Sequence, residues 1–235
     1  MVTRGLTRAT ATPRGIYLEA FFGTAEVGLF AVPTEEICLI PPQLKPRQKR
    51  LIEDVLGVKV IPTTLAGSIL LAPMAVGNSN GILFSNMVLE EEIEAVRKLV
   101  GDLNIGVVEG KYTAIGNLVL ANDRAALASS ILPKRALKKI EDVLGVEGVK
   151  GRIAGRSYVG SLATVTNIGG LVFAEVSEEE EKKLSEIFKV DVIPGTVNNG
   201  IRFVRSGVIA NSKGAIVGSM TTGPELMTIS RALGV

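Results

Sequence analysis

The sequence predicts a mixed α/β (α+β) protein in which five pseudo-symmetric repeats of about 44 residues close into a ring, with strands inside and helices outside. Helix-ending triplets recur with their middle residues at positions 57, 101, 145, 189 and 234, at intervals of 44, 44, 44 and 45 residues. Asn-containing turns recur at 78, 122, 167 and 211, at intervals of 44, 45 and 44 residues. Charged residues concentrate in the helical segments and almost avoid the Val/Ile/Leu-rich segments, as expected when helices cover buried strands.

Each repeat is expected to begin with a hairpin and to continue into a helix. Apolar segments such as 70–76 and 82–84 flank the Asn turn, and short Val/Ile/Leu-rich runs around an Asn/Gly turn are typical of a hairpin. The next segment, for example 93–100, carries apolar residues at i, i+3 and i+6 or i+7. This spacing predicts a helix with one buried stripe.

Local signals predict the helix boundaries and a third strand. Ser177 and Thr222 each stand three residues before a Glu, the capping-box pattern of a helix start, and Pro133 predicts the start of another helix. A Gly after the helix predicts a left-handed C-cap. Short apolar runs such as 58–61 and 190–193 predict a further strand after each of the first four helices.

The first and last repeats are expected to differ from the others. The first is predicted to carry residues 24–27 in place of the Asn turn, with ten extra residues around 41–46. The fifth ends at Val235, directly after its helix, so segment 17–22 is expected to supply the missing strand and close the ring. A repeat of this size buries too little surface to fold alone.

The predicted organisation is therefore a single domain, 17–235, preceded by a basic N-terminal extension, 1–16, that we expect to be flexible. The repeat boundaries fall at approximately 17–61, 62–105, 106–149, 150–193 and 194–235.

The composition argues against conventional enzyme chemistry. The 235 residues include no His and one cysteine, Cys38, which removes the commonest general base and the usual Cys/His zinc sites and nucleophile pairs. Cys38 lies in an apolar run and is expected to be a small buried residue. We therefore expect no catalytic residue, no metal site and no cofactor.

Charge and hydropathy indicate a cytoplasmic protein without membrane association. The formal net charge of +2 is too mild for a general nucleic-acid coat. The uncharged run 60–89 is long enough to cross a bilayer, but its Pro and Gly residues favour two strands around a turn. The first 16 residues lack the apolar region of a signal peptide.

Six short motifs carry a resemblance to a known family. They are LAG at 65–67, MAVGNSNG at 74–81, IGN at 115–117, IAG at 153–155, VTNIGGLV at 165–172 and PGTVNNG at 194–200. In this order, with a fivefold repeat, they resemble the translation initiation factor six family of the pentein superfamily over residues 17–235. Without the tail of the eukaryotic members, the chain is most similar to the archaeal ones.

The resemblance implies a five-bladed pentein propeller and a non-enzymatic, monomeric ribosome anti-association factor. Such a factor docks on the large ribosomal subunit, beside ribosomal protein L14 and near the sarcin-ricin loop, and blocks small-subunit joining by occupying space. A part in large-subunit biogenesis is a further implication. The alternative is a pentein scaffold that binds another protein or a small ligand in the ring channel.

The candidate ribosome contacts are a docking rim and three basic groups. The docking rim that the resemblance implies comprises Gly77, Asn78, Ser79, Asn80, Gly81, Gly116, Asn117, Asn198, Asn199 and Gly200. The candidate RNA contacts are Lys45, Arg47, Lys49 and Arg50, with Lys134, Arg135, Lys138 and Lys139 as a second basic cluster and Arg4, Arg8 and Arg14 as a third group. The simpler interpretations stay open, because Asn and Gly make tight turns and basic clusters are commonly solvated helix faces.

Overall fold

Five three-stranded sheets form the interior of the molecule. The structure is a computed structural model that describes residues 15–235, so nearly all of the predicted extension lies outside the described residues. The sheets, each written from first to third strand, are β2 (Val32–Pro33), β3 (Ile37–Ile40) and β4 (Lys59–Pro62); β5 (Ala75–Gly77), β6 (Gly81–Ser85) and β7 (Asn104–Val108); β8 (Val119–Ala121), β9 (Ala125–Ser129) and β10 (Glu147–Gly151); β11 (Ala163–Val165), β12 (Gly170–Phe173) and β13 (Val192–Gly195); and β14 (Val208–Ala210), β15 (Ala215–Gly218) and β1 (Ile16–Glu19).

Every sheet has the same topology. The middle strand pairs antiparallel with the first strand through the short turn and parallel with the third strand after the helix. In the fifth sheet the third strand is β1, from the other end of the chain, with Ile16 opposite Ala215 and Glu19 opposite Gly218. The N-terminal segment thus occupies the place of the strand that the fifth repeat lacks.

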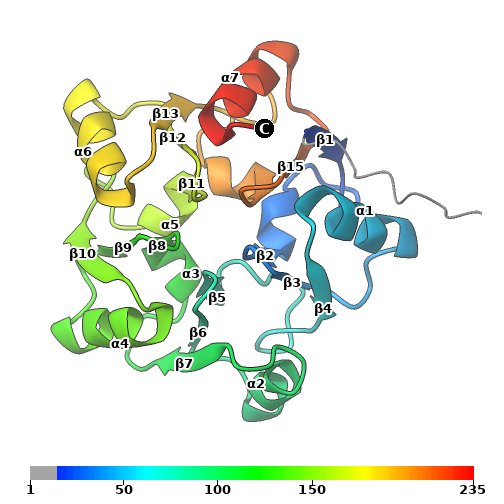
Figure 1. Ribbon diagram of the computed structural model, residues 1–235, viewed down its shortest axis with the longest axis vertical. Helices are drawn as coiled ribbons and strands as arrows, with labels where there is room; N and C mark the ends of the chain where they lie inside the picture. Colours follow the sequence, from blue (N-terminus) through cyan, green and yellow to red (C-terminus); the bar gives the residue numbers. More distant parts are fainter. Residues whose placement is uncertain (1–14) are drawn as a thin grey trace, which may run out of the picture.

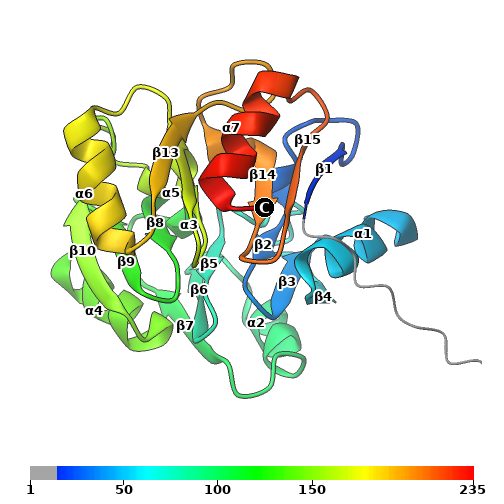
Figure 2. The same ribbon diagram turned by 45° about the horizontal axis from the view of Figure 1, so that its top comes forward.

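The described residues contain nine helices, of which all but α7 connect two strands. The five longer ones are α1 (Pro46–Leu56), α2 (Glu90–Arg97), α4 (Lys134–Leu144), α6 (Glu178–Phe188) and α7 (Gly223–Leu233). The short ones are η1 (Val27–Phe30), α3 (Ile115–Leu118), α5 (Val159–Leu162) and η2 (Val204–Gly207). The five units lie around a common centre, with the longer helices outside the sheets (Figures 1 and 2).

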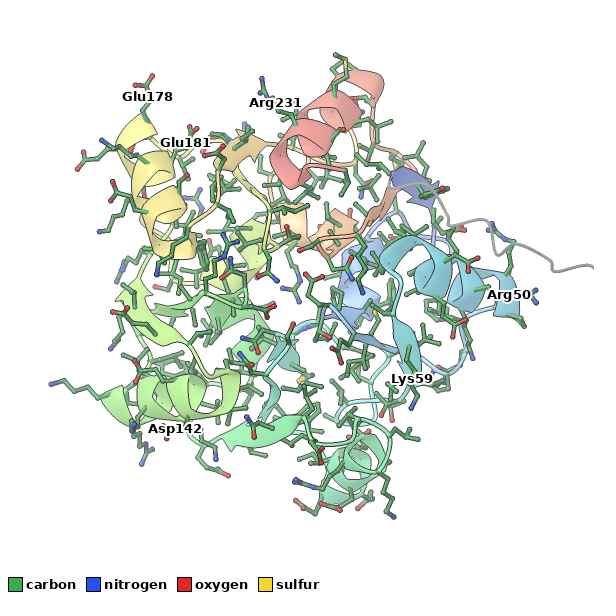
Figure 3. The ribbon with its side chains drawn as sticks, viewed as in Figure 1. Arg50, Lys59, Asp142, Glu178, Glu181 and Arg231 are labelled. Carbon is green, nitrogen blue, oxygen red and sulfur yellow. The ribbon has the colours of Figure 1, made fainter. Side chains whose placement is uncertain are left out.

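The hydrophobic core is divided into five clusters, each shared by neighbouring units. One cluster combines Val76 and Leu83 of the second sheet with Ile140 and Leu144 of α4. The cluster between the fifth and first units is built in the same way, from Ile209 and Ile216 together with residues of α1 such as Ile52. Charged side chains of the helices, such as Arg50 and Asp142, point outward (Figure 3). No unit therefore holds a core of its own.

The predicted helix boundaries are mostly confirmed. Ser177 and Glu180 form the capping box of α6, and Thr222 and Glu225 form that of α7. Pro133 is the N-cap of α4. The C-caps Gly57, Gly145 and Gly234, as well as Lys189, have left-handed backbone with φ between 56° and 66°.

Three predictions about the elements are wrong. The helix α2 ends at Arg97, because the N–H of Leu99 bonds to the C=O of Val96 and tightens the chain into a turn three residues earlier than expected. The short helices, such as α5, are absent from the predicted pattern, which places one helix in each repeat, after the hairpin. Four residues are too few to show a helical period.

The third error concerns the first repeat, where Thr34, not the segment 24–27, occupies the place of the Asn. Thr34 lies 44 residues before Asn78, and its Oγ1 accepts a hydrogen bond from the N–H of Ile37 across the turn. Helix α1 begins 44 residues before α2. The first repeat therefore contains no ten-residue insertion, and the basic residues around Arg47 belong to a regular helix.

Candidate functional site

The sheets run between two different ends of the molecule. At one end, the turns between the first and second strands lie beside the C-termini of the longer helices; at the other, the short helices lead into the first strands. The Asn-turn end comprises residues 34–36, 78–80, 122–124, 166–168 and 211–213, and the short-helix end comprises 21–30, 65–74, 110–118, 153–162 and 197–207. The predicted rim is split between them.

At the Asn-turn end, buried amides tie neighbouring units together. The Asn78 Nδ2 donates to the C=O of Asn122 (3.1 Å) and of Leu144 (2.9 Å), while its Oδ1 accepts from the N–H of Asn80 and Gly81. Asn122 and Asn211 repeat this pattern on the next turn and helix C-terminus. These bonds satisfy carbonyls that a helix leaves free.

The second residues of these turns meet near the centre of this end. The Ser79 Oγ donates to Asp123 (2.7 Å), whose other neighbour is the amide of Asn167 (2.6 Å). The chain of contacts continues through Ser212 to Glu35, with an Oγ–Oε1 distance of 2.8 Å. The side chains at this end are therefore largely engaged with one another.

Residues 77–81 of the predicted rim have structural roles in this network. Asn78 is only 4% exposed. A Cβ on Gly81 would lie 2.3 Å from the C=O of Val143. The amide of Asn80 donates to the C=O of Leu144 (2.9 Å). Packing between units accounts for Asn78 and Gly81, whereas Ser79 is half-buried and Asn80 is exposed.

At the short-helix end, glycines allow neighbouring units to approach closely. A Cβ on Gly116 would lie 1.8 Å from the C=O of Ala72, and one on Gly160 would lie 2.1 Å from the C=O of Gly116. A Cβ on Gly28 would likewise lie 2.0 Å from the C=O of Arg205. Gly116 is therefore a buried packing residue, whereas its neighbour Asn117 is half-buried.

Exposed side chains at this end form a mixed apolar and polar surface. Asn199 and Gly200 are exposed in a turn, whereas Asn198 is buried and donates to the C=O of Ala25 (2.8 Å). Five large apolar side chains that the sequence analysis missed are about 40% exposed here: Phe22, Ile201, Leu70, Tyr158 and Phe203. The sequence contains a signal for three of them. Leu70, Tyr158 and Phe203 occupy the same position in their repeats, at intervals of 88 residues (two repeats) and 45 residues.

Two of these aromatic rings contact each other across a unit boundary. The rings of Tyr158 and Phe203 stack with their centroids 5.9 Å apart, and Phe203 also meets the buried Phe173 edge-on. Arg156 lies over the ring of Phe173, at 4.8 Å from the centroid. We call Phe22, Leu70, Asn117, Tyr158, Asn199, Gly200 and Phe203 the short-helix patch.

Carboxylates of the longer helices hold the turns beside this patch. The Glu225 carboxylate accepts hydrogen bonds from the N–H of Asn199 (3.0 Å) and Gly200 (2.8 Å), and Glu92 does the same for Ala66 and Gly67. Burial raises the pKa of Glu225, but hydrogen bonds from Thr222, Thr196 and Gly200 outweigh it and lower the pKa to about 2. Each charge thereby fixes a left-handed turn.

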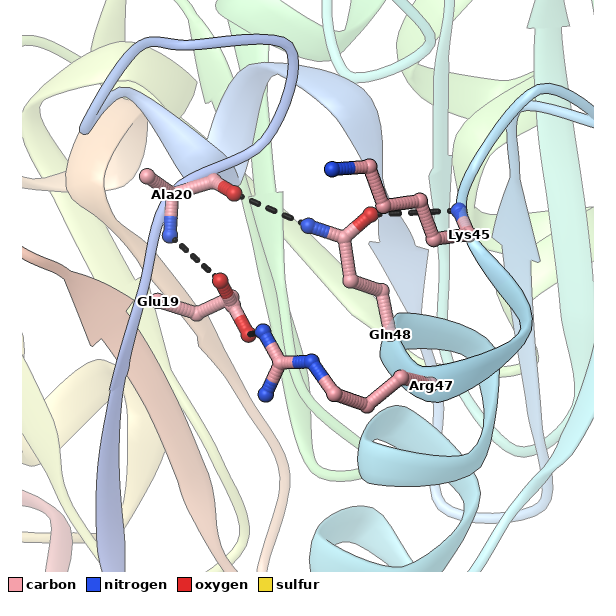
Figure 4. Close-up of polar contacts among 5 residues, drawn as sticks. All are labelled: Glu19, Ala20, Lys45, Arg47 and Gln48. Atoms are coloured by element: carbon pink, nitrogen blue, oxygen red, sulfur yellow. Dashed lines mark hydrogen bonds and ion pairs between the residues drawn. The ribbon is translucent and has the colours of Figure 1, made fainter.

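The first group of predicted RNA contacts lies at the N-cap and in the first turns of α1, and the second lies on α4, both outside the short-helix patch. The Arg47 guanidinium pairs with Glu19 at 2.5 Å, and Gln48, on the same helix, donates to the C=O of Ala20 (Figure 4). The Lys49 Nζ donates to the C=O of Pro42, and Arg50 points outward. The basic cluster thus combines anchoring and solvent-exposed charges. The third candidate group, Arg4, Arg8 and Arg14, lies outside the described residues.

Neither Cys38 nor the space between the first strands offers a reactive group or a large cavity. Cys38 is fully buried, and burial raises the pKa of its thiol to about 12, so it is protonated at neutral pH. The two cavities lined by the first strands have volumes of about 40 Å³ each. Such a volume holds little more than one water molecule. Within residues 15–235, no helix combines the length and hydropathy of a bilayer span.

Comparison with known proteins gives a consistent result. The model of the eIF-6 family matches residues 16–232. Translation initiation factor 6 of Staphylothermus marinus is 41% identical over 216 residues, which cover 91% of this chain and 95% of that protein. The same factor of Pyrococcus abyssi is 42% identical over 219 residues, with coverage of 92% and 96%, and that of Pyrobaculum aerophilum is 42% identical over 213 residues, with 91% and 96%. These relatives are archaeal.

Proposed function

The chain belongs to the eIF-6 family, and from this we propose that it binds the large ribosomal subunit and prevents association with the small subunit by steric blocking. The observation that carries the proposal is the family match over nearly the whole described chain, together with relatives named as translation initiation factors. A steric block needs a rigid body. Hydrogen bonds and core clusters that cross every unit boundary supply that rigidity.

We further propose that the domain 17–235 is a closed, five-bladed pentein propeller. Its support is the pairing of β1 with β15 and the contact between β14 and β2, the first strands of the last and first sheets. Each approximate repeat boundary proposed from the sequence falls inside a third strand, so the proposed blades run one to three residues further, to the ends of β4, β7, β10 and β13, and β1 belongs to the fifth blade.

The short-helix patch is the proposed docking surface. Its polar members Asn117, Asn199 and Gly200 lie beside exposed aromatic rings, and aromatic residues are enriched at protein interfaces. The Asn-turn end is a weaker candidate because its amides and carboxylates already bond to one another. Ribosomal protein L14 and the region of the sarcin-ricin loop are the proposed neighbours, with α1 as a candidate RNA contact.

The same proposal includes a monomeric, non-enzymatic factor of the cytoplasm that needs no cofactor and also takes part in large-subunit biogenesis. The protonated Cys38 and the absence of His support a non-enzymatic role. The alternative of a small ligand in the ring channel is not favoured, because cavities of about 40 Å³ leave no room for a metabolite.

Sedimentation with separated archaeal ribosomal subunits tests the proposal. Purified protein should comigrate with the large subunit alone and should reduce the fraction of joined ribosomes when magnesium is raised. Protein that stays at the top of the gradient while the subunits join normally would refute the proposed function.

Matched variants test the docking surface. Phe203→Glu should weaken large-subunit binding by about tenfold or more, since buried aromatic residues are typical interface anchors. Met227→Glu, which replaces an exposed apolar residue on α7, serves as the control and should bind normally. Equal binding by two folded variants would remove the short-helix patch as the docking surface.

A further inference from the structure

A groove lies between helices α2 and α4. It has a volume of about 520 Å³ and follows the edge of strand β7. Ile93 of α2 and Ile105 and Val107 of β7 form apolar parts of its lining. A second cavity of about 370 Å³ shares Val108, Glu109 and Arg135 and continues past the N-terminus of α4. We call the first cavity the β7 groove.

The strand edge in this groove carries free backbone groups. The N–H of Asn104 donates to the C=O of Asn80, so the alternation of a parallel ladder turns the N–H and C=O of Ile105 and Val107 away from β6. Within the described residues, no hydrogen bond links these outward groups to another element. They are therefore available to an added strand.

In two other sheets, the outward N–H at the position of Ile105 in the third strand already has a hydrogen-bond partner. In β10 the N–H of Gly148 donates to the Glu141 carboxylate (3.2 Å), and in β13 the N–H of Val192 donates to the Ser185 hydroxyl (3.0 Å). Glu141 and Ser185 are 44 residues apart, and 44 residues before Glu141 stands Arg97. A guanidinium has no acceptor, so Arg97 leaves the edge of β7 open.

The sequence of β7 also lacks the usual protection of an edge strand. Its five residues, Asn104–Val108, contain no charge and no Pro, whereas β10 contains Glu147 and Lys150 and β4 contains Lys59 and Pro62. Charged residues and Pro normally keep exposed edges from pairing with other chains. An uncharged open edge is the feature expected of a strand-binding site.

The wall formed by α4 determines the charge of the partner. Lys134, Arg135, Lys138 and Lys139 lie in its first six residues, and Arg135 and Lys139 line the groove. Lys138 pairs with Asp142, but no ion pair is formed by Arg135 or Lys139 within residues 15–235. Arg97 of α2, which pairs with Glu94 (2.9 Å), also lines the groove, as do Glu90 and Glu109. The unpaired cations Arg135 and Lys139 favour carboxylates.

We propose that the β7 groove binds an extended, acidic segment of a partner protein, which adds as a further strand to the edge of β7. The outward N–H and C=O groups of Ile105 and Val107 would pair with the segment's backbone, and its carboxylates would meet Arg135 and Lys139. Main-chain bonds supply affinity in this mode of recognition, and side-chain contacts supply specificity. This surface is separate from the proposed ribosome-docking patch.

Amide NMR of the full-length, isotope-labelled protein tests the proposal. The probe is a blocked seven-residue peptide of alternating glutamate and valine, titrated into the protein to millimolar concentration. The largest shifts should fall on the amides of Ile105 and Val107. A peptide with alternate N-methylated amides, which cannot complete a ladder, and one with lysine in place of glutamate should bind at least about tenfold more weakly.

Paired substitutions on one helix separate the groove from general attraction. The R135E/K139E double variant should weaken peptide binding by about tenfold or more, and the K134E/K138E control, outside the groove, should change it by less than about threefold. Equal effects of the two variants, shifts confined to other elements, or equal binding of the N-methylated peptide would overturn the proposal. Dimerisation of the free protein through β7 would assign the edge to a second copy and also overturn it.

Discussion

Gly116 illustrates how single atoms limit the distance between neighbouring units. A methyl group at this position would collide with the C=O of Ala72, at 1.8 Å. We therefore expect Gly116→Ala to destabilise the protein by about 2–3 kcal/mol, because backbone must move to make room. Urea unfolding measures the change. Gly223→Ala is the control, since its Cβ meets nothing within 4 Å; an equal loss in both variants would contradict the collision.

Glu225 should make the stability depend on pH in acid. Its pKa is about 2 in the folded protein against an ordinary value of 4.5, so its contribution is present above pH 4.5 and is lost as the pH falls towards 2. The shift corresponds to about 3 kcal/mol. Between pH 4.5 and pH 2, the free energy of unfolding of the wild type should therefore fall by about 3 kcal/mol more than that of Glu225→Gln. Denaturant unfolding at several pH values measures it, with Glu178→Gln, on the exposed face of α6, as the control (Figure 3).

The longer helices were predictable because each carries several independent signals. A cap, a buried stripe and a C-terminal Gly recur in α4 and α7, so an error in one signal does not displace the element. The short helices offered only four residues each, and α2 ended early through one hydrogen bond, from Leu99 to Val96. The turn of the first repeat was predicted at the wrong place for a chemical reason. Thr34 stands where the other repeats carry Asn, and its hydroxyl group makes the hydrogen bonds across the turn.

Helix α1 should contribute to ribosome binding through salt-sensitive contacts. Replacing Lys45 and Arg50 by Ala should reduce the slope of log K against log salt by about 0.9 for each lost phosphate contact on duplex RNA, taking the value for B-DNA. Binding to purified large subunits over a range of potassium chloride concentrations measures the slope. The control replaces Lys182 and Lys183 of α6. An unchanged slope in the α1 variant would identify its charges as a solvated helix face.

The split of the predicted rim between two ends could not be seen in the sequence. Gly77 and Gly116 belong to similar Gly/Asn motifs, but one motif follows a first strand and the other precedes one. Only strand direction separates them in space. The aromatic members of the short-helix patch, such as Tyr158, were in principle predictable from their repeat position, whereas their exposure depends on the packing of both neighbouring units.

The pairing of β1 with β15 should stabilise the whole molecule. The N–H of Ala215 donates to the C=O of Gly15, so parallel alternation directs the N–H of Tyr17 towards β15 and that of Leu18 away from it. We expect Tyr17→Pro to lower hydrogen-exchange protection in all five sheets, because every core cluster crosses a unit boundary. Leu18→Pro should have a smaller effect.

Tyr17→Ala separates the side chain from the backbone in this test. It removes the packing of Tyr17 against the first core cluster but keeps the N–H. A loss of protection in Tyr17→Pro that stays confined to the first and fifth sheets would show that the units open independently.

The pairing of the first strand with the last sheet also bears on synthesis of the chain. Strand β1 leaves the ribosome early, but its partner β15 begins only at Ala215. Until β15 has been made, the nascent protein therefore carries an unpaired N-terminal strand and an incomplete core between its first and last units. The native fold can be completed only after β15 and α7 have left the ribosome, so any surface built from several units forms late in synthesis.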